Sequence, residues 1–282
     1  MLLTEFHSDL LKEISRHLDL FSEILLRQTC KKMYTSIAGD NYRDLKGAAE
    51  VGNLTYLKWA NERGHPLTDD VFAYAALGGH MEMMKWLREN DCPWSATACS
   101  AAAQNGHLDA LKWLRENGCP WNSNTCTCAA EGGHIEVLKW AHENGCVLHG
   151  AAFDSAACKG RMNILEWLKE NNCPWNEFTF AYAAGNGHLH VLKWLRENGC
   201  PWTVITFEYA ALAGRLNILE WLRENGCPWD ETACASAAER GHLDVLKWLR
   251  EKGCPWDKQV RVMAESKGRT DLLKWARENQ CP

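Results

Sequence analysis

A tryptophan recurs every 27 residues along this chain. A glycine stands seven residues before each of them, and an Ala-Ala pair lies four and three residues before that glycine in eight of the nine cases. The tryptophans in this register are Trp59, Trp86, Trp113, Trp140, Trp167, Trp194, Trp221, Trp248 and Trp275. A fixed period of this length predicts an array of similar helical units, which is typical of surfaces that bind a partner.

Each unit is predicted to fold as two short helices. In the unit Ser95–Asn122, the small residues of Ala98–Gln104 indicate a first helix that ends at Gly106. The second helix is expected over His107–Asn117, where leucines recur every three residues on one face. Gly118 and the proline that follows it end this helix. Because a single pair cannot bury its own apolar face, each unit needs neighbours.

Charge restricts the class of partner. The chain has 36 acidic and 31 basic residues, a formal net charge of −5, and its first 46 residues are balanced, so the acidic excess lies on the repeats. An acidic array lacks the basic stripe that neutralises phosphates, which argues against nucleic acid. No apolar run is long enough to span a membrane, and no basic segment precedes the first apolar pair. We therefore expect a monomeric cytoplasmic protein with no nucleic acid or membrane partner.

The cysteines follow the repeat. Eight of the 14 occupy one slot: Cys92, Cys119, Cys146, Cys173, Cys200, Cys227, Cys254 and Cys281. Because stacked helices pack about 8–10 Å apart, equivalent cysteines cannot form disulfides and are expected to be small buried hydrophobes. Histidines after the glycine also repeat, and we expect structural hydrogen bonds from His80, His107, His134, His188 and His242. Neither pattern predicts a metal site or a cofactor.

Catalysis is not predicted. The sequence has no glycine-rich phosphate loop, no nucleophile elbow and no metal-spaced His/Glu set outside the repeat register. Its recurrent charged pairs are copies on the second helix of each unit and do not converge. We expect no catalytic residues.

The repeated unit resembles the ankyrin repeat. Residues 102–109, AAQNGHLD, are similar to the ankyrin core "AAxxGHLE", and the likeness recurs over residues 42–282. It implies an all-α solenoid of nine stacked ankyrin-like helix-turn-helix repeats. Ankyrin units usually have 33 residues, so about six are missing here, where many relatives have a β-hairpin finger. Cys-Pro-Trp also replaces the usual "ADV". The array resembles short, Trp-rich ankyrin arrays of large DNA viruses and protists; a viral protein would act in the host cytoplasm.

The resemblance also implies a binding face. In ankyrin proteins, slots that vary between units line the concave surface that meets a protein ligand. Carried onto this chain, the target-binding residues are Gln104, Glu131, Asp154, Lys159, Asn186, Glu208 and Arg240. The alternative interpretation of each is a solvated side chain under no constraint.

The first 41 residues break the period and form a separate helical module. Ser8 is a plausible N-cap, and an apolar stripe follows it at Leu10, Leu11, Ile14 and Leu18. A segment of this length is too short to build a core that is stable alone. It must therefore dock on the first repeat or on another protein.

This module resembles an F-box. Residues 6–14, FHSDLLKEI, are similar to the opening "LPxELLxxI", and residues 29–34, TCKKMY, to the closing "vCrrW". The resemblance implies binding to the Skp-type adaptor of a cullin–RING ubiquitin ligase through Leu10, Leu11, Ile14, Leu18 and Cys30, while the repeats recruit the substrate. In the alternative, the chain is a non-enzymatic scaffold or sequestering protein whose first helices only cap the stack. Polar residues in the last unit, Arg261 and Glu265, predict a terminal capping repeat.

Overall fold

A computed structural model describes residues 41–282. Eighteen α-helices and no strands make up this part of the chain, and consecutive helices form nine pairs. The chain divides into two compact units, Met1–Pro66 and Leu67–Pro282, which are considered separately. The predicted adaptor contacts Leu10, Leu11, Ile14, Leu18 and Cys30 lie outside the described residues.

The helix bounds repeat as the sequence does. In the first unit, the described helices are α3 (Asn41–Glu50) and α4 (Leu54–Glu62). In the second, the first helices of the pairs are α5 (Asp69–Leu77), α7 (Ala96–Gln104), α9 (Ser123–Gly132), α11 (Gly150–Cys158), α13 (Glu177–Asn186), α15 (Val204–Leu212), α17 (Glu231–Arg240) and α19 (Gln259–Ser266). The second helices are α6 (Met81–Glu89), α8 (Leu108–Glu116), α10 (Ile135–Glu143), α12 (Met162–Glu170), α14 (Leu189–Glu197), α16 (Leu216–Glu224), α18 (Leu243–Glu251) and α20 (Thr270–Glu278).

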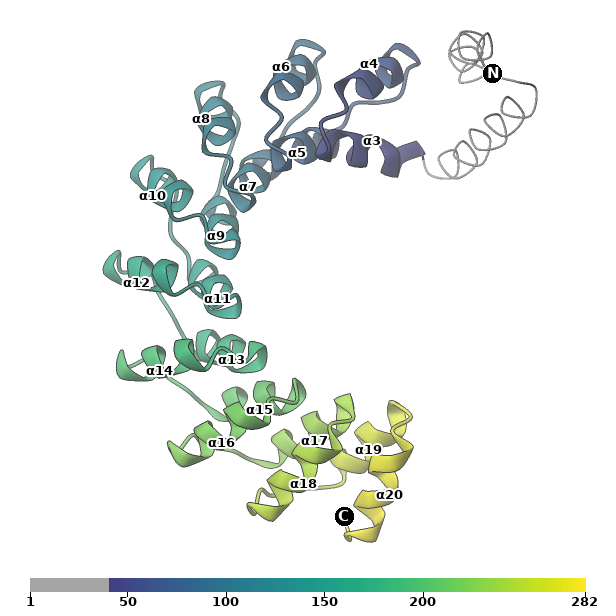
Figure 1. The fold of residues 1–282 in the computed structure, drawn as a ribbon, viewed down its shortest axis with the longest axis vertical. Coiled ribbons are helices and arrows are strands. Elements are labelled where there is room, and N and C mark those ends of the chain that lie inside the picture. The colour runs from purple at the N-terminus through teal and green to yellow at the C-terminus, as the bar shows by residue number, and fades with distance from the viewer. Residues whose placement is uncertain (1–40) are drawn as a thin grey trace, which may run out of the picture. The chain divides into compact units, whose positions relative to one another are not determined.

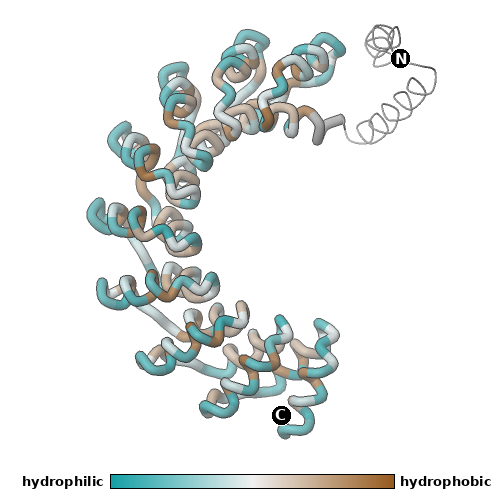
Figure 2. Tube along the Cα trace, in the orientation of Figure 1, coloured by the Kyte–Doolittle hydropathy of each residue, from teal (hydrophilic) through white to brown (hydrophobic). Residues whose placement is uncertain are grey.

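Within Leu67–Pro282 the helices form two rows. Odd-numbered helices contact one another in series from α5 to α19, and each even-numbered helix contacts the odd helix of its own pair. Figure 1 shows the odd row on the inner side of the curve that this unit makes. Apolar residues lie mainly where the helices face each other (Figure 2). The predicted all-α solenoid of ankyrin-like helix pairs is confirmed.

The odd helices pack closely because alanine pairs face the neighbouring unit. Ala102 and Ala103 of α7 are fully buried, as are the equivalent alanines of α5 to α17. The structure starts α7 at Ala96, two residues before the predicted start, since Ser95 is an extended N-cap. Helix α8 lies within the predicted range. The two-helix prediction for this unit is therefore confirmed, with boundaries shifted by one or two residues.

Each closing cysteine is buried, as predicted, and also makes a hydrogen bond that the sequence did not reveal. Its thiol donates to the backbone carbonyl 24 residues earlier, at the start of the same unit, with distances such as 3.4 Å from Cys119 Sγ to Ser95 O. The same bond recurs in every unit from Cys92 to Cys281. The thiol therefore ties the end of each helix pair to its beginning.

Histidines after the glycine join adjacent units. The His188 Nε2 atom lies 2.9 Å from Cys158 O, and His242 Nε2 lies 3.1 Å from Leu212 O, both 30 residues earlier. The predicted structural hydrogen bonds are thus confirmed for these two histidines, and they reach the turn of the preceding unit. In four units the histidine ring lies where a side chain on the repeat glycine of the preceding unit would be; a Cβ at Gly79 would approach the His107 ring to 2.5 Å.

Tryptophan and arginine side chains pack together at the loops that join successive units. The Arg88 guanidinium lies 4.0 Å from the centre of the Trp94 ring, and Trp94 contacts Trp113 edge to face with centroids 6.1 Å apart. Equivalent Arg–Trp pairs occur at Arg115–Trp121, Arg196–Trp202, Arg223–Trp229 and Arg250–Trp256. Cation–π and aromatic contacts therefore stabilise the loops that connect one unit to the next.

We expect the array to lose stability at alkaline pH. Burial raises the pKa of the thiols of Cys92, Cys173, Cys200 and Cys227 to about 12, from 9.0. Below pH 9 these thiols stay protonated in both states; above it the unfolded chain ionises first, so stability falls until the folded pKa is reached. The expected loss at pH 10 is about 1 kcal/mol per thiol. Melting temperatures at pH 8 and 10 should differ less in Cys200→Ala/Cys227→Ala, and an equal difference would contradict this account.

No helix in residues 41–282 combines the length and apolar character needed to cross a bilayer.

Candidate protein-binding surface

The odd-numbered helices expose variable side chains between their buried alanines. We call the side chains of α5 to α17 that remain accessible the inner surface. Two shallow grooves cross it, each formed by three successive odd helices. The repeat thus supplies a constant framework, and the accessible side chains differ from unit to unit.

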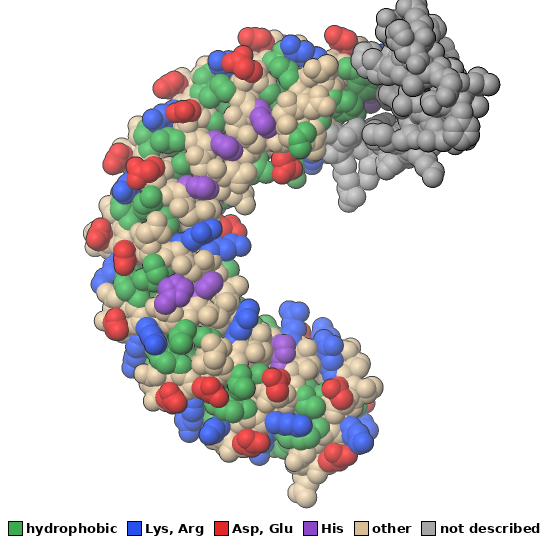
Figure 3. Space-filling view, viewed as in Figure 1, with side chains coloured by type: hydrophobic (Ala, Val, Ile, Leu, Met, Phe, Trp, Pro, Cys, Tyr) green, Lys and Arg blue, Asp and Glu red, His purple; other side chains and the backbone are tan. Residues whose placement is uncertain are grey.

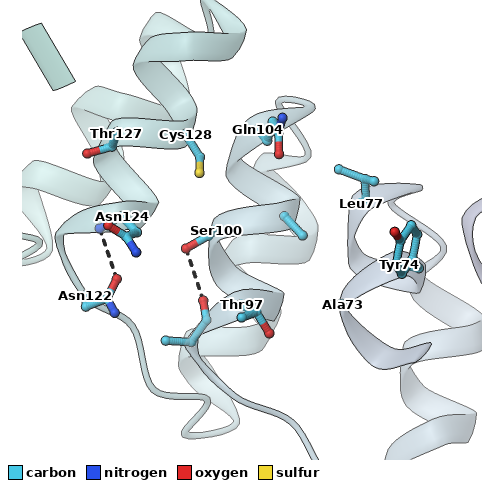
Figure 4. Close-up of a pocket in the computed structure, with 12 residues that line it drawn as sticks. Ala73, Tyr74, Leu77, Thr97, Ser100, Gln104, Asn122, Asn124, Thr127 and Cys128 are labelled. Carbon is cyan, nitrogen blue, oxygen red and sulfur yellow. Dashed lines mark hydrogen bonds between the residues drawn. The ribbon is translucent and has the colours of Figure 1, made fainter. Parts of the chain in front are cut away.

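The first groove crosses α5, α7 and α9 and has a volume of about 340 Å³. Gln104 lies at one end and is exposed. Tyr74 and Leu77 lie on one side of it, and Thr127 and Cys128 on the other (Figure 4). Its walls are largely apolar with hydroxyl and amide groups between them, a combination suited to a mixed polar and apolar peptide segment.

The second groove crosses α9, α11 and α13 and has a volume of about 300 Å³. It brings together three of the predicted target-binding residues, Glu131, Asp154 and Lys159, with Cys158 and Tyr182. Lys159 Nζ lies 3.3 Å from Glu131 Oε1, so these two charges form an ion pair between units. The groove therefore contains one ion pair without net charge and one further carboxylate, that of Asp154.

Asp154 is held by a relay of hydrogen bonds. The backbone N–H of Asn176 donates to Thr179 Oγ1 at 3.3 Å, and the Thr179 hydroxyl donates to Asp154 Oδ1 at 2.6 Å. Burial raises the pKa of the Asp154 carboxyl, and the hydrogen bond from Thr179 opposes part of that rise. A half-buried carboxylate in a fixed position favours a partner group that can neutralise it or donate to it.

The remaining predicted residues lie on both sides of these grooves. Asn186 is exposed at the end of α13, and its amide donates to Cys158 Sγ at 3.3 Å, next to the second groove. Glu208 is half-buried on α15, where burial raises the pKa of its carboxyl and a hydrogen bond to Ser236 lowers it. Arg240 is exposed at the end of α17. Seven predictions thus fall on one row of helices, and only three share a groove.

Sequence reasoning missed the tyrosines of this surface. Tyr74 lines the first groove and Tyr182 the second, and Tyr182 contacts Tyr209 edge to face with ring centroids 5.7 Å apart. All three occupy the slot directly before the Ala-Ala pair, which elsewhere holds glycine, alanine, cysteine or serine. This variability next to two constant alanines is the signal that could have identified them.

The surface suits non-covalent recognition. Among the described residues, no three side chains of the metal-binding types converge on one point. The accessible groups are amides, hydroxyls, carboxylates and tyrosine rings, which bind through hydrogen bonds, ion pairs and aromatic contacts.

Comparison with known proteins matches parts of the array. Residues 180–261 match a family model described as ankyrin repeats in three copies, and residues 71–115 and 99–142 match one described as ankyrin repeats in many copies. No curated protein matches the chain. Among solved structures, the crystal structure of the human ASB11 ankyrin repeat domain is 23% identical, with a TM-score of 0.44, over 56% of this chain and 84% of that one.

Proposed function

Because the chain carries ankyrin repeats and so belongs among proteins that bind other proteins, we propose that it recruits a protein target to a ubiquitin ligase. The inner surface would bind the target, and the first 41 residues would bind the Skp-type adaptor of a cullin–RING ligase. Residues 42–282 would then act as the target-selecting array. The protein would work as a cytoplasmic monomer by non-covalent binding alone.

The inner surface is the observation that carries the target-binding half of this proposal. Packing fixes the buried alanines, yet the side chains between them range from Tyr182 and Asp154 to Gln104 without disturbing the helix register. Side-chain variation on a constant framework is typical of a surface that binds a specific partner. Two grooves on the same row of helices give that partner defined places to bind.

The ligase half rests on the F-box resemblance of the N-terminal residues. The apolar stripe of Leu10, Leu11, Ile14 and Leu18, together with Cys30, provides the adaptor contacts in this proposal. An apolar stripe on a segment too short to fold alone must be buried against another surface, and the adaptor would provide that surface.

Co-purification with the Skp-type adaptor tests the ligase half. We expect the intact chain to retain the adaptor and Leu10→Asp/Ile14→Asp to lose it, because two carboxylates on the stripe cannot be desolvated against an apolar partner. Lys12→Asp/Arg16→Asp is the matched control, with the same spacing on the polar positions of the same predicted helix. An intact, folded chain that retains no adaptor would leave a scaffold whose first helices cap the array.

The same purification tests the inner surface. Asp154→Ala/Tyr182→Ala should keep the adaptor but lose most of the co-purifying target, because it removes a carboxylate and a ring from one groove. Lys193→Ala/Lys247→Ala alters exposed side chains of even helices instead and should change neither. A target retained equally by all variants would exclude the second groove as its binding site.

A further inference from the structure

The charge on one edge of the array changes sign between successive units. The turn edge comprises the six residues around each repeat glycine that link an odd helix to the next even helix. In the first three turns of the second unit, residues 77–82, 104–109 and 131–136, this edge has four carboxylates and no Lys or Arg. In the next three, residues 158–163, 185–190 and 212–217, it has no carboxylate and three cations, Lys159, Arg161 and Arg215.

Within Leu67–Pro282, the acidic residues are missing from positions where the other helix pairs have them. Even helices α6, α8, α10, α18 and α20 have an acidic residue in the first turn, but α12, α14 and α16 do not. At the corresponding positions the middle helices have Asn163, His190 and Asn217. These three neighbouring turns therefore form a basic patch on a chain whose net charge is −5. Figure 3 shows blue and purple side chains gathered in the middle of this unit.

The arginines of the patch are accessible and lack an ion-pair partner. Arg161 and Arg215 are exposed, and neither forms an ion pair with any described residue. Each occupies the slot that holds histidine in five other units and packs over the repeat glycine of the preceding unit. Arg215 Nε donates to Gly185 O at 3.2 Å, which fixes the stem and leaves the end of the guanidinium toward solvent.

We propose that this basic patch binds an acidic segment of a protein through Arg161 and Arg215, at an edge that adjoins the second groove of the inner surface and shares Lys159 with it. A carboxylate already occupies one end of the patch, since Glu131 pairs with Lys159 at 3.3 Å. Arginine guanidinium groups pair with further carboxylates through two parallel hydrogen bonds. His188 and His190 lie between the two arginines in sequence, and their Nε2 atoms contact the carbonyl oxygens of Cys158 and Gly160 in the preceding turn.

The size of the patch favours a short acidic peptide over a nucleic acid. Adjacent units are about 10 Å apart, so Arg161 and Arg215, two units apart, are separated by about 20 Å. An extended peptide covers that distance with about six residues. Acidic residues border the patch on both sides, Glu136 before it and Asp244 after it. They would repel a longer polyanion that continued along the array.

Binding of a labelled octaglutamate peptide to the full chain tests the proposal. In 50 mM salt at pH 8 we expect measurable binding by fluorescence anisotropy that weakens as salt is added. Arg161→His/Arg215→His should weaken it about five- to tenfold, because two guanidinium–carboxylate pairs are lost. Histidine is the residue that the array itself uses in this slot, so the variant should remain folded.

The control is Lys193→Gln/Lys247→Gln, which removes two exposed positive charges from even helices and should bind octaglutamate within twofold of the native chain. Equal weakening by both double variants would show that binding depends only on the net charge of the chain, and it would overturn the proposed site. No binding by the native chain would do the same. Tighter binding of a ten-nucleotide RNA, lost in Arg161→His/Arg215→His, would assign the patch to nucleic acid instead.

Discussion

Replacing Phe180 with alanine is expected to lower the free energy of unfolding by about 3–5 kcal/mol. Its side chain is fully buried in α13, and its ring contacts Trp202 with centroids 5.2 Å apart. Alanine would leave a cavity and remove the support of an indole that lies between two units. Because each unit is stabilised by its neighbours, we expect the helices around α13 to open before those farther away.

Phe178 provides the matched control on the same helix. It lies two residues away with 38% of its surface exposed, so Phe178→Ala should change the unfolding free energy by about 0.5 kcal/mol or less. Thermal unfolding would compare the two variants, and hydrogen exchange would locate the loosened helices. Similar losses in both variants, or uniform loosening along the array, would contradict the packing described for Phe180.

Replacing Gly79 with alanine is expected to destabilise the array by about 3 kcal/mol. Gly79 has a φ of +69°, where alanine is strained by about 1–2 kcal/mol. A Cβ would also lie 2.5 Å from Nδ1 of His107, so the ring that joins the next unit would have to move. The turn cannot easily yield, since the His80 N–H in the same turn bonds to Ala75 O.

Gly118 separates the two causes. Its φ is +82°, but a Cβ there would meet nothing within 4 Å, so Gly118→Ala should lose only the backbone contribution of about 1–2 kcal/mol. Adding His107→Ala to Gly79→Ala should recover part of the loss, which a double-mutant cycle of thermal unfolding would measure. Equal effects of the two glycine variants would mean that the histidine moves aside without strain.

The helix pairs could be predicted because periodicity and turn residues act locally. The 27-residue register, the glycines and the leucine spacing each restrict a few neighbouring residues, and together they gave helix ends within one or two residues in the Ser95–Asn122 unit. The burial of the repeated cysteines followed from the same register. Contacts between units were harder to predict, because their partners depend on how one pair is rotated against the next.

The binding surface shows the same division. The predicted residues all lie on the odd helices or at their ends. The sequence could not show, however, that Glu131 and Lys159 of adjacent units would form an ion pair. Nor could it show that Thr179 would hold Asp154, since the two are 25 residues apart. Nor did the sequence predict that Tyr182 would line the same groove as Asp154.

The two recurrent hydrogen bonds of the array have a short reach. The cysteine thiol bonds to a carbonyl 24 residues earlier and the histidine ring to one 30 residues earlier, so neither extends beyond an adjacent unit. A recombination event that duplicates or deletes a whole unit therefore leaves every remaining unit with the partners it requires. The size of the binding surface can therefore change by gain or loss of whole units, while the contacts that fold each unit stay the same.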